Sequence, residues 1–156
     1  MPTRSAGIML YATFNDQLKV LLVHPGGPYF ASRDEGCWGI PKGMVNPEED
    51  EIDAALRELQ EETGISLPVN TPLFPLSEVK LKSGKRVSAW AAAYKGPEEI
   101  ELISNTYEIR WPPKTGKLYA FPEVDKAAFF TPEMARVKMM EAQSPFLDRL
   151  LVLVKK

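Results

Sequence analysis

Eight acidic side chains crowd into residues 48–62, and a single basic side chain, Arg57, stands among them. On a helix of about 100° per residue, Glu58, Glu61 and Glu62 occupy one side. Like charges three and four residues apart repel each other on a helix, so this cluster needs a neutralising partner. Mg²⁺ prefers hard oxygen ligands and would neutralise it. Beside a phosphate, such a cation polarises the phosphoryl oxygen and activates a water molecule.

A solvated acidic helix face is the alternative interpretation, because most charge runs end on the protein surface. The spacing of the carboxylates alone leaves both interpretations open. Next to the acidic side the same helix carries an apolar stripe, which predicts burial against a core. The stripe consists of Ile52, Ala55, Leu56 and Leu59.

The segment from Gly43 to Ile65 reads GMVNPEEDEIDAALRELQEETGI. Within it, Glu49 follows Gly43 after five residues, and Arg57-Glu58-Leu59 follows after seven more. This pattern resembles the signature of the Nudix hydrolases at every fixed position. The resemblance implies an α/β (α+β) fold, the Nudix-type α/β/α sandwich with a mixed sheet between helices. It also implies that the signature forms a loop, a helix and a second loop.

By motif position, the resemblance implies that Glu58, Glu61 and Glu62 bind Mg²⁺ or Mn²⁺ and that one of them acts as the general base. Gly43 would offer its backbone carbonyl to the metal, and Arg57 would orient a glutamate in the catalytic site. Glu49 would be a secondary metal ligand or a structural residue. Family sites often include one more glutamate outside the signature, and three positions remain open for it: Glu108, Glu101 and Glu123.

The activity implied is metal-dependent hydrolysis of a phosphoanhydride bond in a nucleoside diphosphate-linked substrate. A dinucleoside polyphosphate or a nucleoside triphosphate is expected. A catalytically silent nucleotide-binding sensor on the same fold is the alternative, although the complete set of signature carboxylates argues against it. Pro41-Lys42-Gly43 resembles Nudix members that act on dinucleoside polyphosphates and diphosphoinositol phosphates. One such subgroup carries a tyrosine where this chain has Leu81, Lys82 and Ser83.

Four side chains are candidates for binding the substrate. Lys42 would meet a polyphosphate as a point charge, although a lysine exposed in a tight loop is the alternative. Tyr29 and Trp111 would stack on a base, although aromatic side chains more often pack in a core. Arg33 would contact a phosphate.

Three segments, 24–28, 111–114 and 121–125, resemble a bacterial Nudix subgroup of the NTP pyrophosphohydrolase or dinucleoside polyphosphate hydrolase type. This resemblance implies a cytoplasmic protein. His24 ends a strand, and we expect a structural role with a ligand contact as the alternative. Cys37 has no His-Asp set around it that would make it a nucleophile.

The elements that must position these residues are readable from apolar periodicity and from glycine and proline. A strong helix is expected over 49–63, and Gly64 is expected to cap its C-terminus. Residues 98–116 are expected to be irregular. The remaining expected elements are strands at 6–14, 18–24, 76–82, 86–94 and 127–130, a short extended piece at 38–40, and helices at 132–142 and 145–154.

The chain has 156 residues, which predicts one domain over residues 1–156. Its single cysteine fits a reducing compartment, and because no long apolar run follows the basic residue near the N-terminus we expect no signal peptide. No apolar stretch approaches about 20 residues, which excludes a membrane-spanning helix. A net charge of −2 gives no strong indication of nucleic-acid binding. We therefore expect a small-molecule nucleotide partner, and a homodimer because Nudix members are often dimers.

Overall fold

The computed structural model describes residues 4–114 and 116–155. Five strands form the main sheet in the order β4-β5-β1-β2-β8, and the short strand β3 pairs with β1 at one end. The pair β1–β5 is parallel and the other pairs are antiparallel, so the sheet is mixed. The strands are β1 (Arg4–Phe14), β2 (Gln17–Pro25), β3 (Lys42–Met44), β4 (Phe74–Lys80), β5 (Arg86–Ala93) and β8 (Val124–Phe130).

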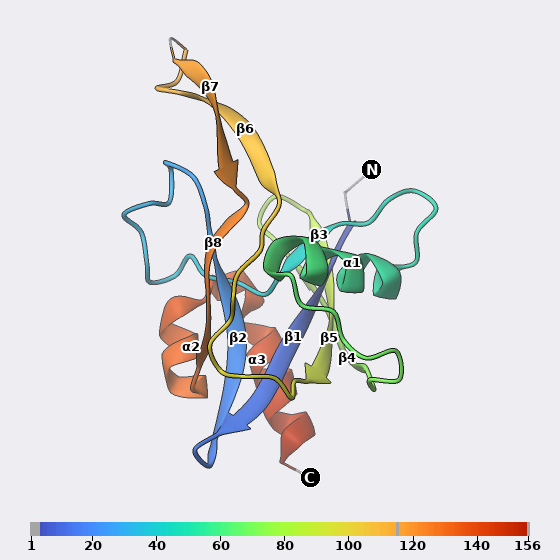
Figure 1. The fold of residues 1–156 in the computed structure, drawn as a ribbon. Coiled ribbons are helices and arrows are strands. Elements are labelled where there is room, and N and C mark those ends of the chain that lie inside the picture. The colour runs from blue at the N-terminus through green and yellow to red at the C-terminus, as the bar shows by residue number, and fades with distance from the viewer. Residues whose placement is uncertain (1–3, 115, 156) are drawn as a thin grey trace.

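Helices cover both faces of this sheet (Figure 1). Helix α1 (Glu51–Thr63) packs its Ala54, Ala55 and Leu59 on one face, against side chains of β1 and β5. Helices α2 (Pro132–Lys138) and α3 (Ser144–Val154) cover the other face. A 3₁₀ turn, η1 (Glu141–Gln143), lies between them. This confirms the expected α/β/α sandwich.

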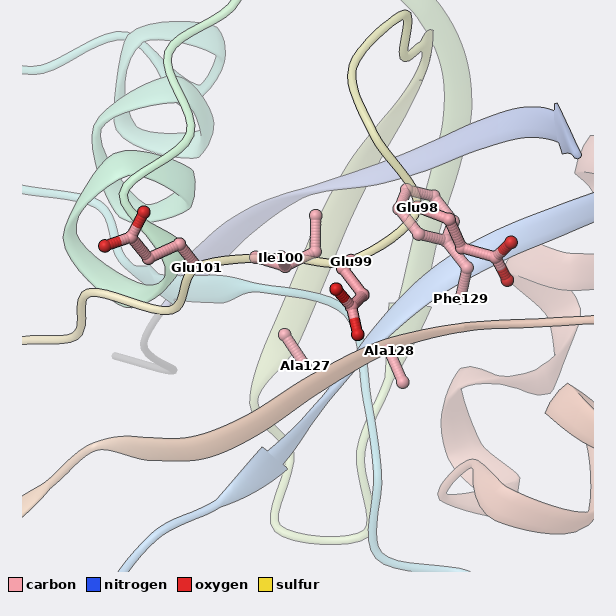
Figure 2. Close-up of a pocket in the computed structure, with 7 residues that line it drawn as sticks. All are labelled: Glu98, Glu99, Ile100, Glu101, Ala127, Ala128 and Phe129. Carbon is pink, nitrogen blue, oxygen red and sulfur yellow. The ribbon is translucent and has the colours of Figure 1, made fainter.

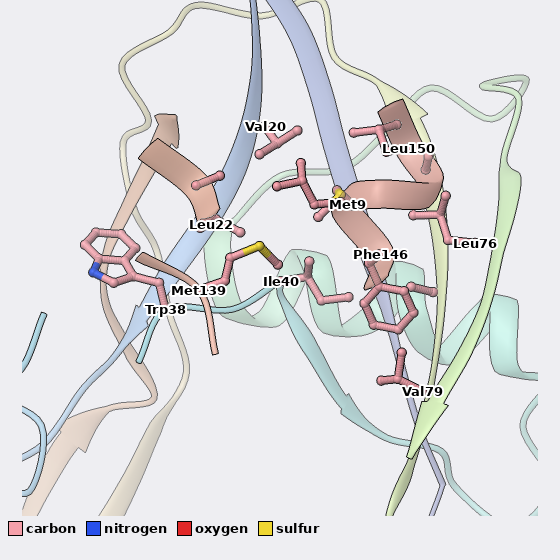
Figure 3. Close-up of a cluster of buried hydrophobic side chains, with 14 of the residues drawn as sticks. Met9, Val20, Leu22, Trp38, Ile40, Leu76, Val79, Met139, Phe146 and Leu150 are labelled. Atoms are coloured by element: carbon pink, nitrogen blue, oxygen red, sulfur yellow. The ribbon is translucent and has the colours of Figure 1, made fainter. Parts of the chain in front are cut away.

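The alternation of side chains along β1 explains why two cores form. Met9 points to the face covered by α2 and α3, while its neighbours Ile8 and Leu10 point to the face covered by α1. Successive side chains of a strand point to opposite faces, so a strand that is apolar throughout is buried on both sides. Figure 3 shows Phe146 and Leu150 packed in the first of these cores with Met9.

The predicted helix begins at Glu51 rather than at residue 49, because Asp50 has extended backbone angles and serves as the N-cap. Gly64 ends it with φ of +83° and donates its N–H to the Gln60 carbonyl, as expected of a left-handed cap. The helix predicted over 132–142 ends at Lys138, because Met139 is extended and caps it.

The expectation of an irregular segment over 98–116 is wrong in part. Strand β6 (Thr106–Trp111) lies within it and pairs with β7 (Lys117–Pro122), which was not expected, in a separate two-stranded sheet. The apolar signal of this hairpin is weak because many of its side chains are exposed. In Figure 1 it projects away from the main sheet.

No helix among the described residues is long and apolar enough to cross a membrane.

Candidate active site

The signature glutamates lie along the border between α1 and the sheet. Within the predicted apolar stripe of α1, Ala55 and Leu59 are fully buried and Leu56 is half-buried, but Ile52 is exposed at the start of the helix. The neighbouring acidic side packs against strand β3. Glu62 is 8% exposed, and the side chain of Glu58 is 12% exposed. These carboxyl groups are therefore held in a poorly solvated position, unlike those of a solvated helix face.

Gly43 is the point of closest approach between β3 and α1. A Cβ atom on Gly43 would lie 1.8 Å from Oε2 of Glu58, so only glycine leaves room for this carboxylate. The neighbouring Lys42 donates its backbone N–H to Oε1 of Glu62 at 3.3 Å. Pairing of Gly43 with Ala6 and of Lys42 with Gly7 fixes β3 to β1. The sheet thus sets the position of both carboxylates.

Arg57 joins the loop and the helix of the signature. Its Nε and Nη2 donate to the two carboxylate oxygens of Glu49 at 2.9 and 3.0 Å. Its Nη1 donates to Glu61 at 2.8 Å and to Glu58 at 3.2 Å, and Nη2 also donates to the Met44 carbonyl at 2.9 Å. These contacts give Arg57 the geometry of a positioning residue. Both oxygens of Glu49 are engaged by Arg57, as expected of a structural residue.

Burial and mutual repulsion disfavour charge in this cluster. Burial raises the pKa of Glu62 to about 8, and the charge of Glu58 adds to the shift. Burial, followed by the charge of Glu61, also raises the pKa of Glu58. Burial lowers the pKa of the Lys42 ammonium, and the charge of Lys85 lowers it further. Two carboxyl groups that resist ionisation beside an amine that resists protonation form a site that a divalent cation would stabilise.

Among the described residues, no three acidic side chains converge on one point as metal ligands would. Arg57 engages oxygens of Glu58 and Glu61 in this conformation. The donor set nonetheless suits a hard divalent cation, since it consists of carboxylate oxygens beside a backbone carbonyl. Because Gly43 has no Cβ atom, the Glu58 carboxylate can approach the backbone of Gly43 closely.

Of the three candidates for the extra carboxylate, Glu123 is joined to the signature helix through the backbone of Asn105. Its charge helps to raise the pKa of both Glu58 and Glu62. Burial, then the charge of Glu61, raises the pKa of Glu123 itself. The chain brings it there because the Glu123 N–H donates to the Asn105 carbonyl, and the Asn105 N–H donates to the Glu61 carbonyl.

The other two candidates lie elsewhere. Glu108 is on β6 opposite Ala120, one position from Tyr107 and therefore on the other face of the hairpin. Glu101 lines a hollow of about 710 Å³ between segment 98–101 and β8. In Figure 2, Glu99 points toward Ala127 and Ala128 across this hollow, and Glu101 lies at its α1 end.

The predicted aromatic residues come together from two segments. The rings of Tyr29 and Trp111 meet edge to face, with centroids 5.2 Å apart and an interplanar angle of 82°. The loop of Tyr29 is tied to the hairpin by the Tyr107 hydroxyl, which donates to the Gly26 carbonyl at 2.9 Å. Arg33 is exposed, and its guanidinium lies 5.9 Å from the Phe30 ring.

His24 holds this loop through the Arg33 carbonyl; the sequence predicted a structural role for it, with a ligand contact as the alternative. It is fully buried, and its Nδ1 lies 2.7 Å from a carboxylate oxygen of Asp125. Its Nε2 lies 2.6 Å from the Arg33 carbonyl, which can only accept a hydrogen bond. Asp125 was not expected as a partner of His24; the signal for it was that His24 begins, and Asp125 ends, two of the segments that resemble the bacterial subgroup. The end of the loop is held where the buried Cys37 donates through Sγ to the Asp34 carbonyl.

The NUDIX domain family model matches residues 1–150. The chain belongs to the NUDIX domain family. The match confirms the expected family and, with it, an enzyme that hydrolyses nucleotide phosphoanhydrides. Divalent metal ions are a general requirement of Nudix hydrolases.

Curated relatives and solved structures agree with this membership. The Bis(5'-nucleosyl)-tetraphosphatase [asymmetrical] of Caenorhabditis elegans is 30% identical over 118 residues, which are 71% of this chain and 79% of the relative. An RNA pyrophosphohydrolase of Erythrobacter litoralis (strain HTCC2594) is 29% identical over 146 residues, 88% of this chain and 80% of the relative.

The fold is similar to that of the C. elegans Ap4A hydrolase in a binary complex, with a TM-score of 0.71 and 20% identity. That match covers 97% of this chain and 98% of the other. The NUDIX domain of Shewanella oneidensis NrtR, solved with ADP ribose, matches with a TM-score of 0.68 and 16% identity, over 99% of this chain and 89% of the other. These two likenesses support the Nudix fold.

Proposed function

We propose that this Nudix enzyme hydrolyses a dinucleoside polyphosphate or a nucleoside triphosphate with the help of Mg²⁺ or Mn²⁺. The burial of Glu62 and Glu58 against the glycine of β3 carries the proposal, because it concentrates carboxylates where they are costly without a cation. The similarity to a tetraphosphatase and to an RNA pyrophosphohydrolase supports a polyphosphate joined to a nucleoside.

In this proposal Glu58, Glu61, Glu62 and the Gly43 carbonyl hold the metal. A metal bound there supplies charge stabilisation at the phosphoryl oxygens and lowers the pKa of a water molecule. Glu123 completes the carboxylate set. Arg57 holds the carboxylates of Glu61 and Glu58 in position through hydrogen bonds, and Glu49 in turn holds the guanidinium of Arg57.

The substrate is bound on both sides of this cluster. Lys42 of β3, whose backbone contacts Glu62, faces the phosphate chain. Burial lowers the pKa of its ammonium group, and an anionic substrate beside it would favour the charged form. Tyr29 and Trp111 contact a nucleobase, and Arg33 contacts a phosphate at the loop surface. A homodimer, a cytoplasmic location and a single domain over residues 1–156 remain part of the proposal.

An assay panel tests this function. The full chain is incubated with Mg²⁺ or with Mn²⁺ and with dinucleoside polyphosphates, nucleoside triphosphates, ADP-ribose or capped RNA, and the released products are measured. We expect turnover of a dinucleoside polyphosphate or a nucleoside triphosphate. Tight binding of one nucleotide with no turnover of any would instead support the catalytically silent sensor.

Glu62→Gln separates chemistry from folding. It keeps the size of the side chain but removes the charge, so we expect turnover to fall roughly 100-fold or more, with the folded structure retained. Circular dichroism of the variant is the control for folding. Near-normal turnover would contradict the proposed role of Glu62 as a metal ligand.

A further inference from the structure

His24 is the chain's single histidine, and it is fully buried near the end of β2. Its Nδ1 is 2.7 Å from a carboxylate oxygen of Asp125, and its Nε2 is 2.6 Å from the Arg33 carbonyl oxygen. A carbonyl and an ionised carboxylate can only accept hydrogen bonds. Both contacts therefore form together only when each ring nitrogen carries a hydrogen, because an imidazole with one N–H group could make only one of them.

A β-bulge brings Asp125 to His24. In the antiparallel pair of β2 and β8, His24 lies opposite Lys126, and the next residue, Pro25, lies opposite Val124. Asp125 is therefore an extra residue that has no partner on β2. In a regular strand its side chain would point away from the face that His24 shares with Lys126, and a bulge can re-aim such a side chain. The additional residue in β8 thus places this carboxylate against the imidazole.

The same bulge determines the position of Glu123. Beyond it the pairing of the two strands continues, and Gly26 donates its backbone N–H to the Glu123 carbonyl at 2.9 Å. Loss of the bulge would shift Glu123 by one residue and turn its side chain to the opposite face of the sheet, since side chains alternate along a strand. The contact between His24 and Asp125 therefore holds the register on which the position of Glu123 depends.

The second contact of His24 holds the loop between β2 and β3. This loop extends from the end of β2 in Figure 1, and the Arg33 carbonyl lies within it. The Arg33 N–H donates to the Phe30 carbonyl at 3.0 Å, which closes a turn directly after Tyr29. The segment that carries the proposed substrate contacts, Tyr29 and Arg33, is therefore attached to the buried imidazole through the backbone of Arg33.

We infer that His24 is a positioning residue whose two ring nitrogens have separate tasks: Nδ1 holds the strand that carries Glu123, and Nε2 holds the loop that contacts the substrate. This inference rests on the proposed function and adds to it a residue outside the signature. The Nδ1 contact should determine kcat, because Glu123 completes the carboxylate set. The Nε2 contact should determine KM, because Tyr29 and Arg33 lie on the loop.

Two substitutions separate the two nitrogens, because the amide nitrogen of asparagine can take the place of Nδ1 and that of glutamine the place of Nε2. In His24→Asn the loop contact is lost, and we expect KM to rise about tenfold while kcat stays near the wild-type value. In His24→Gln the Asp125 contact is lost, and we expect kcat to fall about tenfold while KM stays near the wild-type value. Steady-state kinetics with a dinucleoside tetraphosphate and Mg²⁺ measures both constants.

Variants of β8 provide the controls. Asp125→Ala should reproduce the fall in kcat, and combining it with His24→Gln should add little, because both remove the same contact. Asp125→Asn keeps an oxygen acceptor and should retain most of kcat. Lys126→Ala is the matched control, because Lys126 lies opposite His24 with an exposed side chain, and it should leave both constants unchanged.

Two measurements need no turnover and keep this inference separate from the proposed function. Because His24 is the only histidine, untagged protein with ¹⁵N-labelled histidine gives NMR signals from one imidazole, and we expect a bonded hydrogen on each ring nitrogen. Amide hydrogen exchange should accelerate over residues 27–36 in His24→Asn. In His24→Gln it should instead accelerate at Gly26 and Glu123, whose N–H groups donate to the Glu123 and Asn105 carbonyls.

Any of three results would overturn the inference. They are a ring nitrogen of the wild type without a hydrogen, equal changes of KM and kcat in the two His24 variants, and exchange that accelerates over the same residues in both. Thermal unfolding checks that each variant is folded. Should both His24 variants fail to fold, Asp125→Ala and Asp125→Asn still test the Nδ1 contact, because the Asp125 side chain is 30% exposed and its replacement leaves the buried ring in place.

Discussion

Glu62 shows how one position on a helix acquires its chemistry from its surroundings. It lies four residues after Glu58 and contacts the backbone of Lys42 across the border with the sheet. Burial raises the pKa of its carboxyl group to about 8. A divalent cation that binds there must displace that proton, which couples metal binding to pH.

The metal-free protein should lose stability as the pH rises. Glu62 binds its proton more tightly in the folded protein, with a pKa of about 8, than at its ordinary value of 4.5. The free energy of unfolding therefore decreases between these two pH values, by an amount on the order of a few kcal/mol. Thermal unfolding with a chelator, from pH 5.5 to 8.5, measures this fall.

Glu62→Gln should flatten that pH profile, while exposed Glu48→Gln should not. Added Mg²⁺ should also flatten the wild-type profile, because the cation stabilises the ionised carboxylate. Parallel profiles for wild type and Glu62→Gln would contradict the assignment of the shift to this residue.

Gly43→Ala tests the close approach between β3 and α1. The new Cβ atom would overlap the Glu58 carboxylate, so that side chain must move by about 1 Å or more. Misplacement on this scale can cost about 100-fold in rate, and we expect turnover to fall accordingly. Steady-state kinetics measures it, with Met44→Ala as control, since the Met44 side chain is exposed on the same strand. A variant with wild-type turnover would show that the position of Glu58 does not limit catalysis.

At the scale of elements, the signature is a loop and a helix held together by one guanidinium. Arg57 contacts Glu49 before the helix and Glu61 within it, and it also binds the Met44 carbonyl of β3. Its planar fork satisfies both oxygens of Glu49 at once, which an ammonium group cannot do. The side chain of Arg57 therefore fixes the loop, the strand and the helix relative to one another.

Arg57→Lys should weaken metal binding without unfolding the chain. The charge remains, but the bidentate contact with Glu49 is lost, and losses of this kind cost about 10- to 100-fold in metal affinity or activity. The dependence of turnover on Mg²⁺ concentration measures the apparent affinity. Arg136→Lys is the control, because Arg136 pairs with Asp148 on the surface. An unchanged metal dependence in Arg57→Lys would remove Arg57 from the positioning role.

The elements also show what the sequence could and could not predict. The helix from Glu51 to Thr63 was predictable because its apolar stripe, acidic side and capping Gly64 are all local signals. Strands β1 and β2 were predictable because both are apolar and a short polar turn joins them. The β6–β7 hairpin was missed because its residues are half-buried at most and Trp111-Pro112-Pro113 interrupts the pattern.

The extra carboxylate could not be chosen for a different reason. Glu101, Glu108 and Glu123 have similar sequence surroundings, and only the path of the chain distinguishes them. Asn105 joins Glu61 to Glu123 through backbone hydrogen bonds, and no local pattern encodes that bridge. Likewise, the signature predicted the glutamates of α1, but the contact of Glu58 with Gly43 depends on the pairing of β3 with β1.

At the scale of the whole molecule, the two cores have separate tasks. The core under α1 supports the glutamates, whereas the core under α2 and α3 holds the opposite face of the sheet. Arg149 of α3 strengthens this second layer by donating to the Leu76 carbonyl at 2.9 Å and to the Glu78 carbonyl at 3.1 Å. Substitutions in the core under α2 and α3 should therefore reduce turnover only by unfolding the protein.

Phe146→Ala tests this separation. Phe146 is fully buried in the core under α2 and α3, so its truncation should lower the free energy of unfolding by about 3–5 kcal/mol. Urea unfolding measures the loss, and Val152→Ala on the exposed side of α3 is the control. The turnover of the folded fraction at low temperature should remain near wild type. A large fall in turnover with little loss of stability would show that the two layers are coupled.

The loop that carries Tyr29 and Arg33 ends beside a thiol whose labelling rate can report the opening of the loop. Cys37 is the chain's single cysteine, and its buried thiol donates to the Asp34 carbonyl at the end of that loop. A thiol reagent can therefore label the protein only when this end of the loop opens. Its labelling rate measures how often the loop opens, and a nucleotide that closes the loop over Tyr29 would slow the labelling.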